Sequence, residues 1–178
     1  MKINIGEYPV KRWYHKLLGL EPQRKEKIRI DSWDTHNVDA TLSLIIAPLL
    51  KEYINNHNGS PNVDDEDVPF AFRRIAAPAL SEKDLENGNV DENYHKRWEW
   101  VLKEMLFAFE SSNRDWEEDF ASGTIDLVLK TLPNSDLLYS DEGPNHTYKV
   151  DEEGRKACEK RIKNGFRLFG KYYNNLWS

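Results

Sequence analysis

The sequence predicts a mainly α (α+β) fold: a single-domain helical bundle of three long helices, with short helices and a minor two-stranded β element. Apolar residues recur at three- and four-residue steps over residues 38–56, 91–111 and 151–177, which is the period of amphipathic helices. Residues 27–33 and 124–132 instead alternate polar and apolar side chains, as strands with one covered face do. The chain has 178 residues, which suffices for one buried core and not for two independent ones.

Residues 1–26 are expected to form an irregular N-terminal arm in front of a helical core over 27–178. Pro9 and Pro22 punctuate this arm, and its charged residues follow neither the helical nor the strand period. We expect a short helix around residues 13–18. The strand at 27–33 follows, and its expected partner is the strand at 124–132.

The helix at 38–56 is apolar on more than one side and should therefore lie at the centre of the core. Pro48 lies inside it, removes one backbone donor and should bend it, and Gly59 is its expected stop. Residues 60–69 form a loop with four adjacent acids, 64–67, between two prolines. One or two helical turns are expected over 70–77, and a polar loop over 82–89.

The helix at 91–111 carries two apolar stripes. Trp100 and Phe107 lie seven residues apart, nearly opposite to the main stripe, which consists of Tyr94, Trp98, Leu102, Met105, Leu106 and Phe109. The main stripe should pack on the core, and the second must find another partner, either the 113–121 turn or another subunit. The second stripe therefore predicts a homo-oligomer.

The last helix, 151–177, has an apolar face and a cationic face. Gly165 and Gly170 should let a neighbouring element approach closely beside the apolar face, which consists of Cys158, Ile162, Phe166, Phe169 and Tyr173. Five cations follow the same spacing on another side: Lys156, Lys160, Lys163, Arg167 and Lys171. Such a line of like charges is either a solvated face, or it meets the acidic 64–67 loop in the same or a neighbouring subunit, or it binds a phosphate-bearing ligand.

Acids also gather at the expected turn between strand and helix, where Asp31, Asp34 and Asp39 surround His36. Hard oxygen ligands of this kind bind divalent cations, so the group is an alternative metal site, although a helix cap explains part of it. With His95 and Glu99 it would make a metal-dependent phosphohydrolase. A lone histidine on the apolar side of a helix, such as His95, is more often a packed core residue. The sequence contains no nucleotide, zinc or nucleophile motif, and no cofactor is expected.

Flat aromatic side chains and guanidinium groups are what a nucleotide pocket needs, and the chain has both. The formal net charge of −6 makes a nucleic-acid polymer an unlikely partner and favours a small, discrete anion. Core packing is the competing explanation for the aromatics. The candidate ligand contacts are Trp33, Arg73, Arg74, His95, Arg97, Trp98, Lys160, Lys163, Arg167 and Lys171.

Four segments together resemble, in the same order, an uncharacterised family of small proteins encoded by tailed bacteriophages. They are IRIDSWDTHNVDATLSLIIAPLL, HNGSPNVDDEDVP, HKRWEWVLKEMLFAFE and RIKNGFRLFGKYYNNLW. The resemblance covers nearly all of residues 27–178 and implies a source, but no activity. The single cysteine, the lack of a secretory signal and the lack of a membrane span suggest the reducing cytoplasm of the host, with packaging in the virion as an alternative.

Three functions follow as expectations. The first is a non-enzymatic accessory protein that binds a small phosphorylated or nucleotide-like ligand, such as a host antiviral signal. The second is a virion protein or host-protein interaction protein without a small ligand. The third is the metal-dependent phosphohydrolase.

Overall fold

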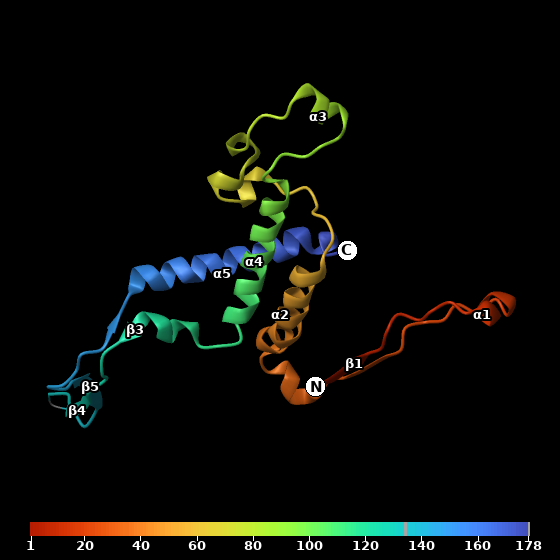
Figure 1. The fold of residues 1–178 in the computed structure, drawn as a ribbon. Coiled ribbons are helices and arrows are strands. Elements are labelled where there is room, and N and C mark those ends of the chain that lie inside the picture. The colour runs from red at the N-terminus through yellow and green to blue at the C-terminus, as the bar shows by residue number, and fades with distance from the viewer. Residues whose placement is uncertain (134, 178) are drawn as a thin grey trace. The chain divides into compact units, whose positions relative to one another are not determined.

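The computed structural model describes residues 1–133 and 135–177, and it combines α-helices with short strands (Figure 1). The chain divides into two compact units, Met1–Leu42 and Ser43–Ser178. A single domain with an arm ending at residue 26 was expected from the sequence, so the division lies further along than expected. The reason is that the strand expected to belong to the core pairs with the N-terminal strand instead.

The first unit is an extended ribbon. Strand β1 (Lys2–Ile5) pairs antiparallel with β2 (Glu26–Arg29), so that Lys2 lies opposite Arg29 and Ile5 opposite Glu26. Helix α1 (Trp13–Leu17) lies between them in the sequence, and the two connecting segments run side by side out to it (Figure 1). A 3₁₀ turn, Ser32–Thr35, follows. None of the residues of this unit is buried.

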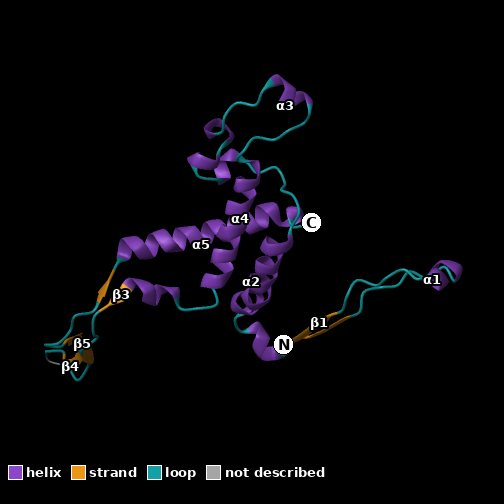
Figure 2. Cartoon of the chain, in the orientation of Figure 1, coloured by secondary structure: helices purple, strands orange, loops and turns teal. Residues whose placement is uncertain are grey.

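Three long helices are present, as the apolar periods predict, and Figure 2 shows them in purple. They are α2 (Val38–Asn56), α4 (Tyr94–Ser111) and α5 (Glu152–Tyr172), and Pro48 lies inside α2. α5 ends five residues before the predicted boundary and continues as a 3₁₀ turn, Tyr173–Asn175. The expected polar loop at 82–89 contains a short helix, α3 (Glu82–Glu86), whose first turn is capped by Ser81.

Short 3₁₀ turns occupy the segments between these helices. Two of them, Phe70–Phe72 and Arg74–Ala76, lie where one or two helical turns were expected, and the others are Asp65–Asp67 and Trp116–Phe120.

The expected pairing of strands was wrong. The strand predicted at 124–132 is present as β4 (Leu127–Thr131), but its partner is β5 (Leu138–Glu142). β5 lies in residues 133–151, a polar stretch for which the sequence predicts turns. A further pair joins β3 (Ala121–Ser122) to β6 (Lys149–Val150). Closing a short hairpin costs less chain entropy than joining strands almost a hundred residues apart, so local pairs form throughout the described residues.

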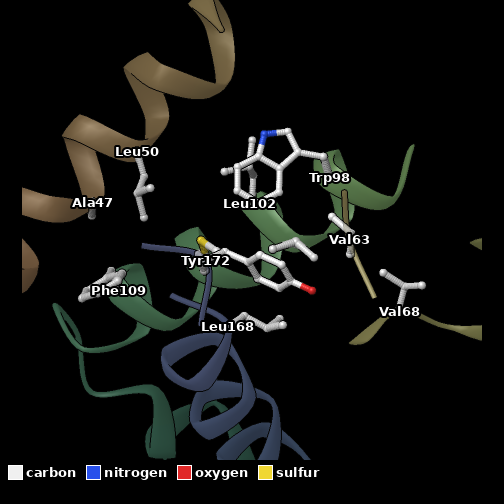
Figure 3. Close-up of a cluster of buried hydrophobic side chains, with 11 residues drawn as sticks. Ala47, Leu50, Val63, Val68, Trp98, Leu102, Phe109, Leu168 and Tyr172 are labelled. Carbon is white, nitrogen blue, oxygen red and sulfur yellow. The ribbon is translucent and has the colours of Figure 1, made fainter. Parts of the chain in front are cut away.

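The core of the second unit forms where α4 crosses α5 (Figure 3). Trp98, Leu102 and Met105 of the predicted main stripe are fully buried. Leu168 and Tyr172 of α5 pack against them, and Ala47 and Leu50 of α2 add to the cluster. Val63 and Val68, which flank the acidic loop, complete it.

The buried face of α5 agrees only in part with the predicted one: Ile162 is buried and Phe169 packs against the core as predicted. Phe166 and Tyr173 are exposed, and the buried line consists of Ile162, Gly165, Leu168 and Tyr172. Gly165 explains the shift: a Cβ atom there would overlap the carbonyl oxygen of Glu104 and lie 2.6 Å from the Cβ of Ala108. The helices therefore approach most closely at the residue without a side chain, as the sequence predicted for Gly165. The same prediction for Gly170 was wrong, because no atom lies within 4 Å of a Cβ built there.

The second stripe of α4 is covered by this chain. Trp100 is half-buried against the core. The guanidinium of Arg161 lies 3.7 Å from the ring centre of Phe107, while its nitrogens bind the Glu104 carboxylate at 2.7 and 3.0 Å. The oligomer contact predicted at Trp100 and Phe107 therefore has partners within the chain. Within the described part of the chain, no helix is both long and apolar enough to cross a bilayer.

Candidate functional site

The acidic loop is bound to the cationic face of α5 in the same chain. Asp67 is at the centre, and its side chain is only 1% exposed. One carboxylate oxygen accepts from Arg167 at 2.7 Å, and the other from Lys171 Nζ and the Tyr172 hydroxyl, each at 2.6 Å. Of the three explanations for the cation line, the loop in the same subunit thus accounts for its last two members.

The neighbours of Asp67 strengthen this attachment. Lys171 also lies 2.8 Å from Asp64 and 3.6 Å from Glu66. The backbone N–H of Asp64 donates to the Tyr172 hydroxyl at 3.0 Å. Figure 3 shows that hydroxyl directed towards the segment that carries Val63 and Val68. The loop is therefore attached to α5 by its backbone as well as by its charges.

The pKa values of this network follow from its geometry. Burial by itself would raise the pKa of Asp67, but hydrogen bonds from Lys171, Tyr172 and Arg167 outweigh burial and lower it. Hydrogen bonds to Asp64 and Asp67 raise the pKa of Lys171. Burial, and the hydrogen bond that it donates to Asp67, raise the pKa of Tyr172 to about 12. The carboxylate and ammonium are thus charged, and the phenol neutral, at neutral pH.

Arg73 and Arg74 shape the same loop. The Arg74 guanidinium donates to Asn62 Oδ1 at 2.6 Å and to the Val63 carbonyl at 3.3 Å, and its backbone N–H donates to Asp65 at 3.1 Å. Arg73 Nε donates to the Val68 carbonyl at 3.3 Å. These two candidate ligand contacts therefore serve the conformation of residues 62–68.

Arg97 and Trp98 lie inside the core, where a ligand cannot reach them. Each is 0% exposed. Arg97 donates to both carboxylate oxygens of Asp91, at 2.9 and 2.7 Å, and this contact lowers the pKa of Asp91. The Trp98 ring packs edge-on against Tyr172. The sequence predicts both as ligand contacts, whereas the structure places both on the face of α4 that packs on α5 and on the loops.

The remaining candidates are dispersed. His95 is exposed, with its Nδ1 2.9 Å from the hydroxyl of Ser60. Lys160 is exposed, and Lys163 pairs with Glu159 on its own helix at 2.5 Å. Trp33 is exposed in the first unit. Within the second unit, none of the described hollows is lined by His95, Lys160 or Lys163.

The acids considered for a metal have other partners. Asp34 accepts from the Asp31 backbone N–H at 2.8 Å and from the Met1 ammonium at 2.9 Å, and these contacts lower its pKa. Asp31 pairs with Arg29 at 3.1 Å. Among the described residues, no three His, Cys, Asp or Glu side chains are placed to hold a metal ion, so His36 and Asp39 do not complete a site with Asp31 and Asp34.

Two surfaces that the candidate residues do not include stand out. The first is residues 1–30, which extend the expected arm to the end of the β1–β2 ribbon and are called the arm from here on. It exposes many large apolar side chains: Ile3, Ile5, Tyr8, Val10, Trp13, Tyr14, Leu17, Leu18, Leu20, Ile28 and Ile30. At its tip, Trp13 and the cationic side chains of Lys11, Arg12 and Lys16 line a hollow of about 500 Å³. Eight Lys and Arg against three Glu give the arm a net charge of +5.

The second surface is an apolar groove of about 540 Å³ in the second unit. Its walls come from α2, from the end of α5 and from the 3₁₀ turn after it: Ile46, Leu49, Leu50, Tyr53, Phe169, Tyr173 and Leu176. Residues 43–178, which contain it, carry 17 Lys and Arg against 25 Asp and Glu, a net charge of −8. Tallying charge segment by segment, and not over the whole chain, would have revealed this separation from sequence.

Comparisons of the chain with protein-family models, with curated proteins and with solved structures found no match in any of the three. Function is therefore inferred from the geometry alone.

Proposed function

We propose that this chain is a protein-interaction factor whose arm, residues 1–30, binds another protein, and that no small-molecule ligand is needed for this role. One observation carries the proposal: none of the residues Met1–Leu42 is buried, although the arm is rich in large apolar side chains. Trp13 and Leu17 at the tip are 79% and 75% exposed. Exposed apolar surface of this extent is typical of an interaction site.

The arm has little to stabilise it by itself. An isolated two-stranded ribbon is marginally stable in water, and a helix as short as α1 is unstable without tertiary contacts. Burying a large apolar side chain contributes about 1.5–3 kcal/mol, so covering five of those in the arm contributes on the order of 10 kcal/mol before the costs of association. A partner protein thus provides the core that the arm lacks.

A protein partner fits the arm better than a small anion does. Lys11, Arg12 and Trp13 suit an anion, but a small ligand would leave Leu17, Leu18 and the ribbon isoleucines in water. The residues first considered for an anion support the same choice, since Arg97 and Trp98 are buried and Arg167 and Lys171 already bind the acidic loop. For a phage-encoded chain, as the resemblance implies, the partner would be a phage-encoded or a host protein.

Hydrogen exchange of the full-length chain tests the proposal. In a dilute, monomeric sample the backbone amides of the arm should exchange at rates close to those of an unfolded peptide, while those of α4 should be strongly protected. Slow exchange of the arm in the monomer would refute the proposal, because the arm would then be covered by its own chain.

A photo-crosslinking amino acid at position 13 identifies the partner in cells that express the full-length chain. The matched control places it at position 85, where Leu85 is 62% exposed in the second unit. Discrete adducts at position 13 and none at position 85 support the proposal. Equal labelling at both positions contradicts it.

A further inference from the structure

We infer that the partner of the arm is a second copy of this chain, and that the arm of one copy binds the apolar groove between α2 and the end of α5 in the other. This inference rests on the proposed function and names its partner. It starts from the separation of charge along the chain: the arm carries +5 and residues 43–178 carry −8. The two segments of different copies therefore attract each other, and such attraction steers association.

The tip of the arm has the form of a helix that binds in a groove. Trp13 and Leu17 are four residues apart on α1, so they project from one face of that helix. Lys11, Arg12 and Lys16 line the hollow beside Trp13, where Lys11 also pairs with Glu21 at 2.7 Å. An apolar pair of anchors with flanking charges is the usual pattern of helix-in-groove recognition, in which the apolar contacts give affinity and the charges give orientation.

The groove has the size and the chemistry for these anchors. Its volume of about 540 Å³ lies within the range of about 300–1,000 Å³ of pockets that enclose a ligand. Apolar and aromatic side chains form its walls, and Leu49 and Tyr173 are 66% and 62% exposed. Exposed apolar side chains on a concave surface gain most when another apolar group covers them.

A second copy is favoured because both complementary surfaces belong to one polypeptide. In a two-fold symmetric pair each copy gives its arm and receives the other arm, so one association forms two identical contacts and leaves neither surface open. The second contact forms within an existing complex, which strengthens the pair without new interactions. An unrelated acidic protein could bind the cationic arm, but it would leave the apolar groove exposed to solvent.

Sedimentation equilibrium of the full-length chain measures the association. Wild type should form a dimer whose dissociation constant rises about tenfold or more between about 50 and about 500 mM NaCl, because salt screens the attraction between arm and acidic unit. Leu49→Lys puts a cation into the groove and should weaken the dimer at least about 30-fold, as loss of a central contact does. The matched control is Leu44→Lys, at a residue of α2 that is 65% exposed and does not line the groove, and it should leave the dimer unchanged.

Charge reversal tests the other side of the contact. The triple variant Lys11→Glu, Arg12→Glu, Lys16→Glu should be monomeric, whereas Lys156→Glu with Lys160→Glu, at exposed positions of α5, should dimerise like wild type. A mixture of the triple variant with Leu49→Lys should form a heterodimer, since one intact arm then meets one intact groove. Its affinity should lie between that of wild type and that of either variant alone.

The outcomes separate this inference from the proposed function. A wild-type chain that is monomeric at high concentration, with rapidly exchanging arm amides, refutes the second copy and leaves the arm available for another protein. A monomer with protected arm amides refutes both. A dimer that Leu49→Lys and the triple variant leave intact, or a mixture that forms no heterodimer, refutes the contact proposed here.

Discussion

The crossing of α4 and α5 depends on the missing side chain of Gly165, so Gly165→Ala should destabilise the protein. An ideal Cβ atom at this position lies 2.6 Å from the Cβ of Ala108 and 3.2 Å from the carbonyl carbon of Glu104, and overlaps the Glu104 carbonyl oxygen. Carbon atoms in van der Waals contact are about 3.5–4.0 Å apart. The two helices would therefore have to separate by about 1 Å.

The net effect is the difference between two terms. Overpacking a core costs about 1–3 kcal/mol, and the upper end applies here because the obstructing atoms include helix backbone. Alanine also favours a helix over glycine by about 1 kcal/mol. The free energy of unfolding should thus fall by about 2 kcal/mol. Gly170 on the same helix is exposed, and no atom lies within 4 Å of a Cβ built there. Gly170→Ala should therefore raise the free energy of unfolding by about 1 kcal/mol.

Urea unfolding, followed by far-ultraviolet circular dichroism and tryptophan fluorescence, measures both variants against wild type. Ala108→Gly in the Gly165→Ala background removes one obstructing atom, and the double-mutant cycle should show a favourable coupling between the two positions. The reasoning is refuted if Gly165→Ala is as stable as Gly170→Ala, since the helices would then not be in the close contact described.

Three further predictions concern single side chains. Asp67→Asn removes the charge that Arg167 and Lys171 face and should lower the free energy of unfolding by about 3 kcal/mol in urea at neutral pH. Because the pKa of Asp67 is lowered on folding, its stabilisation is complete above about pH 4 and is lost as the pH falls towards the folded pKa. Wild type should therefore lose stability below about pH 4 more steeply than Asp67→Asn, and parallel pH profiles would contradict the network. Arg161→Ala leaves the buried Glu104 carboxylate unpaired and should lower the free energy of unfolding by about 3 kcal/mol in the same assay. Arg161→Lys should lower it by about half as much, because lysine keeps the charge but not the paired hydrogen bonds. An Arg161→Ala variant as stable as wild type would exclude the pairing. Burial raises the pKa of the Cys158 thiol, so iodoacetamide should alkylate the native protein about tenfold more slowly than the urea-unfolded chain, and equal rates would contradict its placement.

Local patterns were enough to predict the three long helices. The period of α2 and the main stripe of α4 are repeated every few residues, so their positions follow from side chains close together in the sequence. The close approach at Gly165 was also predictable, because no other residue type allows it. The buried face of α5 was not, since Phe166 and Leu168 are both apolar and the choice between them depends on where α4 crosses.

The candidate site shows the same division. Sequence spacing identified a line of cations on α5 and an acidic loop, and it left open whether the two meet. Arg97 and Arg167 are both arginines on predicted helices, and both were candidate ligand contacts from the sequence. In the structure, Arg97 is enclosed in the core with Asp91, whereas Arg167 binds Asp67 at the surface of α5. The positive net charge of the arm could be predicted by counting its charged residues. The net charge of the whole chain, −6, does not show it, because the rest of the chain carries more negative charge.

The sequence by itself determined the three long helices, the short turns over 70–77 and the residues that carry charge, because each depends on interactions between near neighbours. Only the tertiary structure decided which strands pair, which face of α5 is buried and which cations have acidic partners. These depend on contacts between residues up to a hundred positions apart, and their energies are set by burial and geometry that no local pattern records.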